Sequence, residues 1–110
     1  MRIKKVTDKA IIFDNGMLIT FDHCRDCCEY NYADFSILTP NTVNFDYDFD
    51  EIQFKAVDGM GFKFGCEGHW IFIPCYSEQN GYYTDEIDIY FCGEHVLHFR
   101  CDFRCEERIY

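Results

Sequence analysis

The sequence predicts a small all-β fold, an antiparallel sandwich or partly open barrel of about eight strands with little or no helix. Apolar and polar residues alternate with a period of two through most of the chain. No long segment repeats apolar residues with the helical period. Successive β-prone runs lie roughly eight to twelve residues apart, with turn residues between them, as in sandwiches and barrels.

The length of 110 residues fits one domain, which we place over residues 1–110. A chain of this size buries roughly two thirds of the surface that its unfolded form exposes. The 48% hydrophobic content includes twelve Phe, eight Tyr and one Trp. This apolar area is large enough that the fold does not require a disulfide or a metal ion.

The first half of the chain predicts three strands. Residues 2–6 form the first. Residues 9–13 and 17–21 are expected to pair as a hairpin, because Asn15 and Gly16 between them tolerate positive φ.

Five further strands are expected, separated by short turns, at residues 51–57, 61–66, 70–75, 87–92 and 96–101. Because side chains alternate along a strand, Ile87, Ile89 and Phe91 share one face. Asp88 and Tyr90 share the other face. Pro74 cannot donate to a ladder and should mark an edge or a bulge.

The segment from Leu38 to Glu51 is ambiguous. Its acidic and aromatic residues alternate, with the acids at Asp46, Asp48, Asp50 and Glu51 and the rings at Phe45, Tyr47 and Phe49. We favour a strand with one acidic and one aromatic face. The alternative is a loop that offers acidic and aromatic groups to a partner.

Charge limits the range of partners. Twenty acidic and ten basic residues give a formal net charge of −10. The resulting field repels nucleic-acid phosphates and anionic lipid, so we expect no direct nucleic-acid binding. It attracts a protein partner with a basic surface. The expected binding residues are Asp46, Tyr47, Asp48, Asp50 and Glu51, although the same charge would serve solubility alone.

The N-terminal residues and the lengths of the apolar runs predict the cell compartment, which in turn predicts the state of the cysteines. The N-terminal residues 1–10 are too polar for a secretory signal, and no apolar run approaches the length of a membrane span. We therefore expect a cytoplasmic protein without membrane contact. Its eight cysteines should then be reduced thiols.

The stretch FDHCRDCCEY, residues 21–30, holds the densest cluster of reactive residue types. His23, Cys24, Cys27 and Cys28 are zinc-type ligands at zinc-type spacing. A second Cys-x2-Cys pair is absent from the sequence, and an extended strand would hold Cys24 and Cys27 about 10 Å apart. His95 and His98 would join such a site only if the fold brought their hairpin alongside.

Two other roles compete for this cluster. A thiolate at Cys27 or Cys28 could be a nucleophile, activated by a histidine and oriented by Asp26 or Glu29, although acidic neighbours disfavour the thiolate. We favour the view that most of the cysteines pack as small apolar residues among aromatic rings. On this view the protein needs no cofactor, and zinc is the alternative.

Two motifs support a resemblance to a known family. His23 precedes Asp26-Cys27-Cys28-Glu29, and Asn80-Gly81-Tyr82-Tyr83 precedes the run IDIYF. Over residues 10–91 the chain resembles a family of small uncharacterised proteins found in bacteriophage and bacterial genomes. It departs from that pattern at Arg25, where glutamine is more usual, and in additional cysteines at 92, 101 and 105.

The resemblance implies a phage or mobile-element accessory protein, in the host cytoplasm if phage-encoded, that inhibits a host defence protein. Together with the charge, it predicts a non-enzymatic acidic protein-binding domain. A structural zinc domain built on Cys24, Cys27 and Cys28 and a thiol-dependent enzyme are the alternatives. The sequence leaves a homodimer open.

Overall fold

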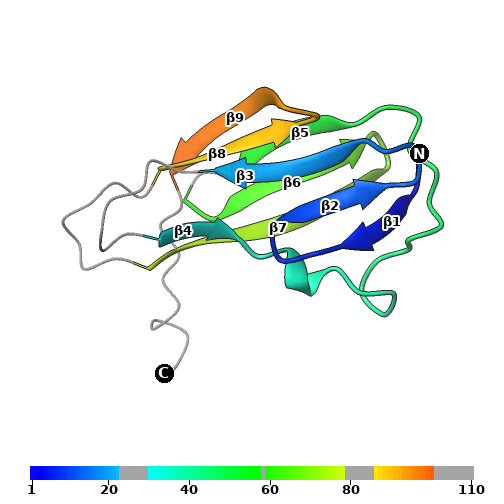
Figure 1. The fold of residues 1–110 in the computed structure, drawn as a ribbon, viewed down its shortest axis with the longest axis horizontal. Coiled ribbons are helices and arrows are strands. Elements are labelled where there is room, and N and C mark those ends of the chain that lie inside the picture. The colour runs from blue at the N-terminus through cyan, green and yellow to red at the C-terminus, as the bar shows by residue number, and fades with distance from the viewer. Residues whose placement is uncertain (23–29, 58, 79–85, 101–110) are drawn as a thin grey trace.

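The computed structural model describes residues 1–22, 30–57, 59–78 and 86–100, and it confirms the all-β class (Figure 1). These residues form two antiparallel sheets with nine strands in total. The five-stranded sheet has the order β1 (Ile3–Val6), β2 (Ala10–Phe13), β3 (Leu18–Asp22), β8 (Glu86–Phe91), β9 (Glu94–Arg100). The four-stranded sheet has the order β4 (Tyr30–Ala33), β7 (His69–Glu78), β6 (Gly61–Cys66), β5 (Gln53–Val57).

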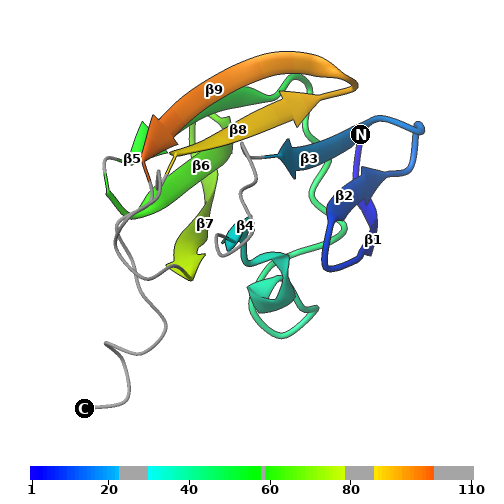
Figure 2. The ribbon, with the colours of Figure 1, turned by 60° about the vertical axis from the view of Figure 1, so that its left-hand side comes forward.

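The two sheets pack face to face and approach each other along one side. There the edge strand β9 lies beside the edge strand β5, and in Figure 2 the β8–β9 hairpin curves over β5 and β6. The connection from β4 to β5 runs around the molecule and passes the N-terminus (Figure 1). The arrangement is therefore a sandwich that is partly closed into a barrel.

The short helix in that connection is η1, a 3-10 turn over Phe35–Ile37. Its N-cap residue Asp34 accepts a hydrogen bond from the Ser36 amide at 3.1 Å, which satisfies a backbone donor that the turn leaves unpaired. No helix in the described part of the chain has the length and apolarity that a membrane crossing requires.

The hairpins expected from the sequence are confirmed. Gly16 has a φ of 87° in the turn between β2 and β3. Between β8 and β9, Cys92 and Gly93 have φ values of 53° and 85° while Phe91 pairs with Glu94. Two consecutive residues with positive φ match the twist of a tight two-residue hairpin.

Pro74 lies within strand β7, at the point where the pairing partner of the strand changes. This strand pairs with β6 from His69 to Pro74 and with β4 from Cys75 to Glu78. It lies inside the sheet order, so Pro74 is not on an edge strand. It instead occupies the point where the strand changes partner, and a missing N–H is tolerated there.

The observed strands differ from the expected ones in two places. Strand β4 was not expected, and it brings the count to nine among the described residues. The favoured strand over Leu38–Glu51 does not form, because η1 ends at Ile37 and the chain continues in turns and loop to β5. Local hydrogen bonds account for the turns: Val43 N–H donates to Thr39 O, and Asp46 N–H donates to the Asn44 side chain.

The core lies between the sheets and is mainly Ile and Phe. Its residues with at most 1% exposure come from both sheets and from the β4–β5 connection: Ile11, Phe13, Ile19, Ala33, Phe35, Phe49, Phe62, Phe64, Ile73, Cys75, Ile87 and Ile89. Buried Cys75 behaves as the small apolar residue that the sequence predicts. The remaining described cysteines are half-buried Cys66 and exposed Cys92.

Phe13 is the centre of the aromatic packing. Its ring meets Phe49, Phe64 and Phe91 edge to face, with centroid distances of 6.3, 6.4 and 6.5 Å. Edge-to-face pairs of this kind add roughly 0.5–1.5 kcal/mol beyond area burial. Because Phe49 belongs to the β4–β5 connection, this contact fastens that loop to both sheets.

We expect Phe49→Ala to lower the free energy of unfolding by about 3–5 kcal/mol, because it removes a fully buried ring and leaves a cavity. Urea denaturation measures the loss. Ile37→Ala is the matched control, since Ile37 is 37% exposed in the same connection and should cost under about 1 kcal/mol. Equal losses in the two variants would contradict the packing described here.

Candidate functional site

The first candidate site is the acidic loop, which we define as residues 43–51. Its carboxylates at Asp46, Asp48, Asp50 and Glu51 are all exposed. Between them, Phe45 and Tyr47 are half-buried, and Phe49 is buried. The alternation read from the sequence is therefore present, although the backbone is a loop. The aromatic side chains point inward and the acidic ones outward.

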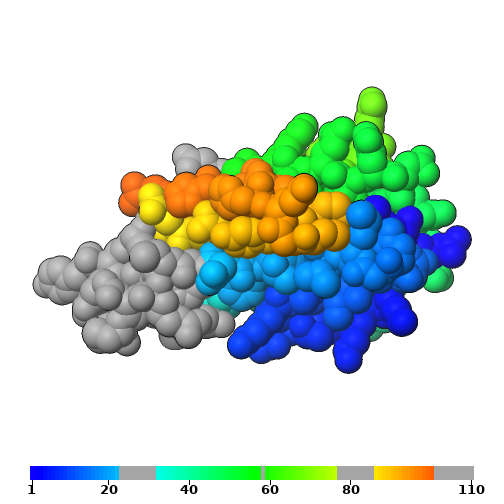
Figure 3. All heavy atoms as spheres, turned by 45° about the horizontal axis from the view of Figure 1, so that its top comes forward, coloured from blue at the N-terminus to red at the C-terminus, as the bar shows by residue number. Residues whose placement is uncertain are grey.

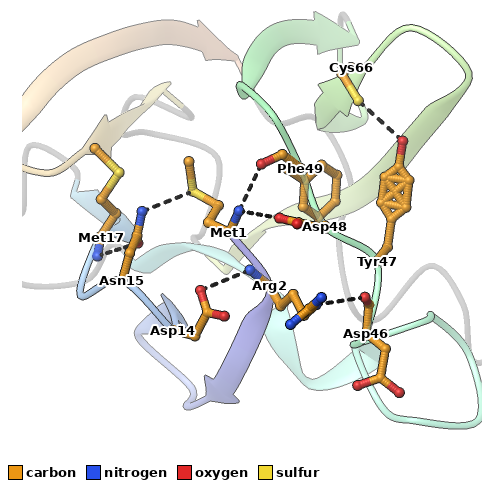
Figure 4. A network of polar contacts seen from close by, with 10 residues as sticks. All are labelled: Met1, Arg2, Asp14, Asn15, Met17, Asp46, Tyr47, Asp48, Phe49 and Cys66. Atoms are coloured by element: carbon orange, nitrogen blue, oxygen red, sulfur yellow. Dashed lines mark hydrogen bonds and ion pairs between the residues drawn. The ribbon is translucent and has the colours of Figure 1, made fainter.

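The N-terminal segment holds the acidic loop at residues 46, 48 and 49 (Figure 4). The Met1 ammonium donates to Asp48 Oδ1 at 2.6 Å and to Phe49 O at 2.8 Å, and Phe49 N–H donates to Met1 O at 2.8 Å. Arg2 Nε donates to Asp46 O at 3.1 Å. The hydrogen bond and charge of the ammonium lower the pKa of the Asp48 carboxyl below its usual value. Asp48 is thus partly neutralised within the protein.

Tyr47 fastens the middle of the loop to the β6–β7 turn. Its hydroxyl shares a hydrogen bond of 3.5 Å with Cys66 Sγ (Figure 4). Its ring stacks on His69 at a centroid distance of 3.9 Å and an interplanar angle of 8°. The Cys66 hydrogen bond raises the pKa of the Tyr47 phenol above its usual value. Tyr47, one of the expected binding residues, therefore positions the loop.

A groove of about 460 Å³ lies next to the acidic loop. The β4–β5 connection and the start of β7 line it, with Ile37, Leu38, Thr42, Val43, Asn44, His69, Trp70, Ile71 and Phe72. Ile37 and Phe72 are each 37% exposed. On the Trp70 ring, Lys55 Nζ lies 4.8 Å and Lys63 Nζ 5.6 Å from the centroid. The groove is mostly apolar and adjoins the carboxylates through residues 42–44.

The second candidate site is a cluster of Asp88, His95 and His98 on the β8–β9 hairpin. Asp88 Oδ1 lies 2.9 Å from His95 Nε2 and 2.6 Å from His98 Nδ1. One ligand atom from each residue fits within 4.8 Å of the others. Imidazole nitrogen and carboxylate oxygen are ligands for transition-metal ions.

A β-bulge makes this cluster. Asp88 pairs with His98 and Ile89 with Leu97, but Tyr90 pairs with His95, which leaves Val96 as an extra residue. In a regular strand, residues three apart would point to opposite faces. Because of the extra residue, His95 points to the same face of the sheet as His98.

The same sheet face carries further polar side chains. Asp22 on β3 lies directly opposite Asp88. Glu86 Oε1 lies 3.6 Å from His98 Nε2, and the Tyr90 ring lies 5.4 Å from the His95 ring. The hydrogen bond that the His98 ring donates to the Asp88 carboxylate raises the pKa of His98, and the charges of Asp88 and Glu86 act in the same direction.

The sequence did not single out Asp88. The available signal was the predicted face shared by Asp88 and Tyr90, next to a strand with two histidines. His95 and His98 are three residues apart, so in a regular strand they would point to opposite faces. Only a bulge between them would place them on one face. The sequence of the hairpin contains no feature that predicts this bulge.

Several sequence-predicted residues lie outside the described residues. These are His23, Cys24, Asp26, Cys27, Cys28 and Glu29 of the early motif and Asn80, Gly81, Tyr82 and Tyr83 of the late motif. The strand expected at 96–101 is described as β9 up to Arg100. The zinc and thiol hypotheses for the early motif therefore stay predictions.

Comparisons with protein-family models, curated proteins and solved structures give no match to this chain. Fold and sites define it as an all-β sandwich that carries an exposed acidic loop beside an apolar groove. A histidine–carboxylate cluster lies on its β8–β9 hairpin.

We expect the pKa of His98 in metal-free protein to exceed the usual histidine value of about 6.5 and to fall in Asp88→Asn, because the variant loses the charged hydrogen-bond acceptor. Proton NMR titration measures it. Since the pKa is raised by folding, the Asp88–His98 contact stabilises the protein below the usual pKa. This stabilisation is lost as the pH rises through the raised value.

Glu94→Gln is the control for this titration, because exposed Glu94 belongs to the same hairpin but not to the cluster. It should leave the pKa of His98 in place. An unchanged pKa in Asp88→Asn would show that the Asp88–His98 contact does not form in solution.

Proposed function

We propose that the protein is a non-enzymatic binding domain whose acidic loop and adjacent groove bind a basic segment of another protein. The observation that carries the proposal is the outward display of four carboxylates by a loop whose aromatic side chains point inward. Asp46, Asp48, Asp50 and Glu51 are exposed, while Phe49 is packed in the core. A segment already held in one conformation loses little entropy on binding, which favours affinity.

Charge supports the chemistry of the partner. The chain has a formal net charge of −10, so a basic protein is attracted at long range. Asp46 and Asp50 form no ion pair with another described residue, whereas Asp48 is paired with the Met1 ammonium. Lys or Arg side chains of a partner would therefore meet Asp46 and Asp50 first.

The groove supplies the apolar part of the proposed interface. Ile37 and Phe72 expose apolar surface at its walls, and Val43 connects it to the acidic loop. Protein interfaces commonly combine an apolar centre with a charged rim. The expected ligand is a segment with an apolar side chain for the groove and basic residues on one side of it.

The family resemblance supplies the biological setting of this proposal. It suggests a phage or mobile-element accessory protein that acts in the host cytoplasm by binding and inhibiting a defence protein. A nuclease that grips nucleic acid with a basic surface has the required charge. Formation of a homodimer is a separate question, which sedimentation of the isolated chain would answer.

The test uses two sets of synthetic peptide probes, both with four Lys or Arg residues; one set also contains a Leu or Phe and the other does not. At low ionic strength we expect Asp46→Asn/Asp50→Asn to weaken binding roughly three- to tenfold, because two exposed charge pairs are lost. Fluorescence anisotropy measures the affinity. Added salt should reduce the difference between wild type and variant.

Asp8→Asn/Glu94→Gln is the matched control, because it removes the same charge from exposed residues outside the acidic loop. It should weaken binding far less. Phe72→Ala should weaken the peptides that contain Leu or Phe and spare those without one. Equal effects of the two charge variants would mean that only net charge matters and would remove the loop as a site.

A further inference from the structure

We propose that Asp88, His95 and His98 bind a divalent transition-metal ion, for which Zn²⁺ is the best fit. The proposal is independent of the acidic loop. It also uses none of the cysteines that suggested zinc in the sequence. Its basis is the convergence of three ligand-type side chains from two paired strands on one face of the five-stranded sheet.

The distances suit a single ion. Asp88 Oδ1 is 2.9 Å from His95 Nε2 and 2.6 Å from His98 Nδ1, and the three ligand atoms lie within 4.8 Å of one another. Ligands held at about 2.0–2.1 Å from a tetrahedral zinc ion are about 3.3 Å apart. Small rotations of side chains would therefore open the present hydrogen bonds enough for the ion. The rings of both histidines are 50% exposed, so the ion has access from solvent.

The hairpin that carries the three ligands is paired along its length and packed on the core. Ile87, Ile89 and Phe99 on the opposite face of the hairpin are buried in the core. The bulge at Val96 fixes the direction of His95, and the ladder between β8 and β9 continues on both sides of it. Figure 3 shows β3, β8 and β9 as adjacent bands on one face of the molecule. A site on paired strands keeps its ligands in place better than one on a loop.

Electrostatics favour a cation at this position. Asp22 lies directly opposite Asp88 on the neighbouring strand. Glu86 adds a further carboxylate near His98. The negative field of the whole chain would raise the local concentration of a dication.

Ligand type selects the metal. Two imidazoles and one carboxylate favour zinc and its neighbours over Mg²⁺ and Ca²⁺, which prefer all-oxygen sites. If His98 binds through Nδ1, its Nε2 faces Glu86 Oε1 at 3.6 Å. A carboxylate behind a metal-binding histidine is the usual outer-shell arrangement. Glu86 is then a positioning residue, and water completes the coordination.

The test is calorimetric titration of the EDTA-treated full chain with Zn²⁺. We expect one ion at this site, with affinity reduced about tenfold or more in His95→Ala and in His98→Ala. Glu94→Gln, on the same hairpin, should bind as wild type does. Because both histidines are exposed, the alanine variants should keep the wild-type circular-dichroism spectrum.

A cysteine variant separates this site from the thiols. Cys24→Ser/Cys27→Ser/Cys28→Ser should retain the ion that the histidine variants lose. In NMR spectra, Zn²⁺ should shift the ring signals of His95 and His98 but not those of His69. The proposal is overturned if the histidine variants bind zinc like wild type, if only the cysteine variant loses it, or if the two ring signals do not move.

Discussion

The packing of Phe49 against Phe13 and Phe64 is the interaction on which the rest of the structure depends. Phe13 belongs to one sheet and Phe64 to the other, so the ring of Phe49 fills the space between them. The same contact fixes a long connection that contains no strand. Because the rings of that connection turn inward, its carboxylates must turn outward, and the acidic surface follows from core packing.

The histidine–carboxylate cluster depends on a different constraint, the extra residue in β9. A regular ladder would place His95 and His98 on opposite faces, with one of them directed toward the core. The bulge at Val96 keeps apolar Leu97 and Phe99 in register with Ile89 and Ile87 while both histidines face outward. One inserted residue thus serves both the core and the cluster.

The fold class, the hairpin at Asn15-Gly16 and the pairing of β5, β6 and β7 could be predicted, because alternation and turn residues act over short distances. The loop over Leu38–Glu51 could not, since its alternation matches that of a strand. Turns at Thr39 and Asn44 and the long-range contact of Phe49 decide its conformation. The alternation in residues 87–91 predicts the correct face for Asp88. Its grouping with His95 and His98 could not be predicted, because it depends on the register between β8 and β9, which includes a bulge.

Native-state hydrogen exchange at the Phe49 amide tests the central role of this residue most directly. The amide donates to Met1 O at 2.8 Å within a loop that lacks a ladder. If burial of the Phe49 ring holds the loop, this amide should exchange nearly as slowly as those of β2, and faster in Phe49→Leu. Exchange at the rate of an exposed loop in the wild-type protein would contradict the account.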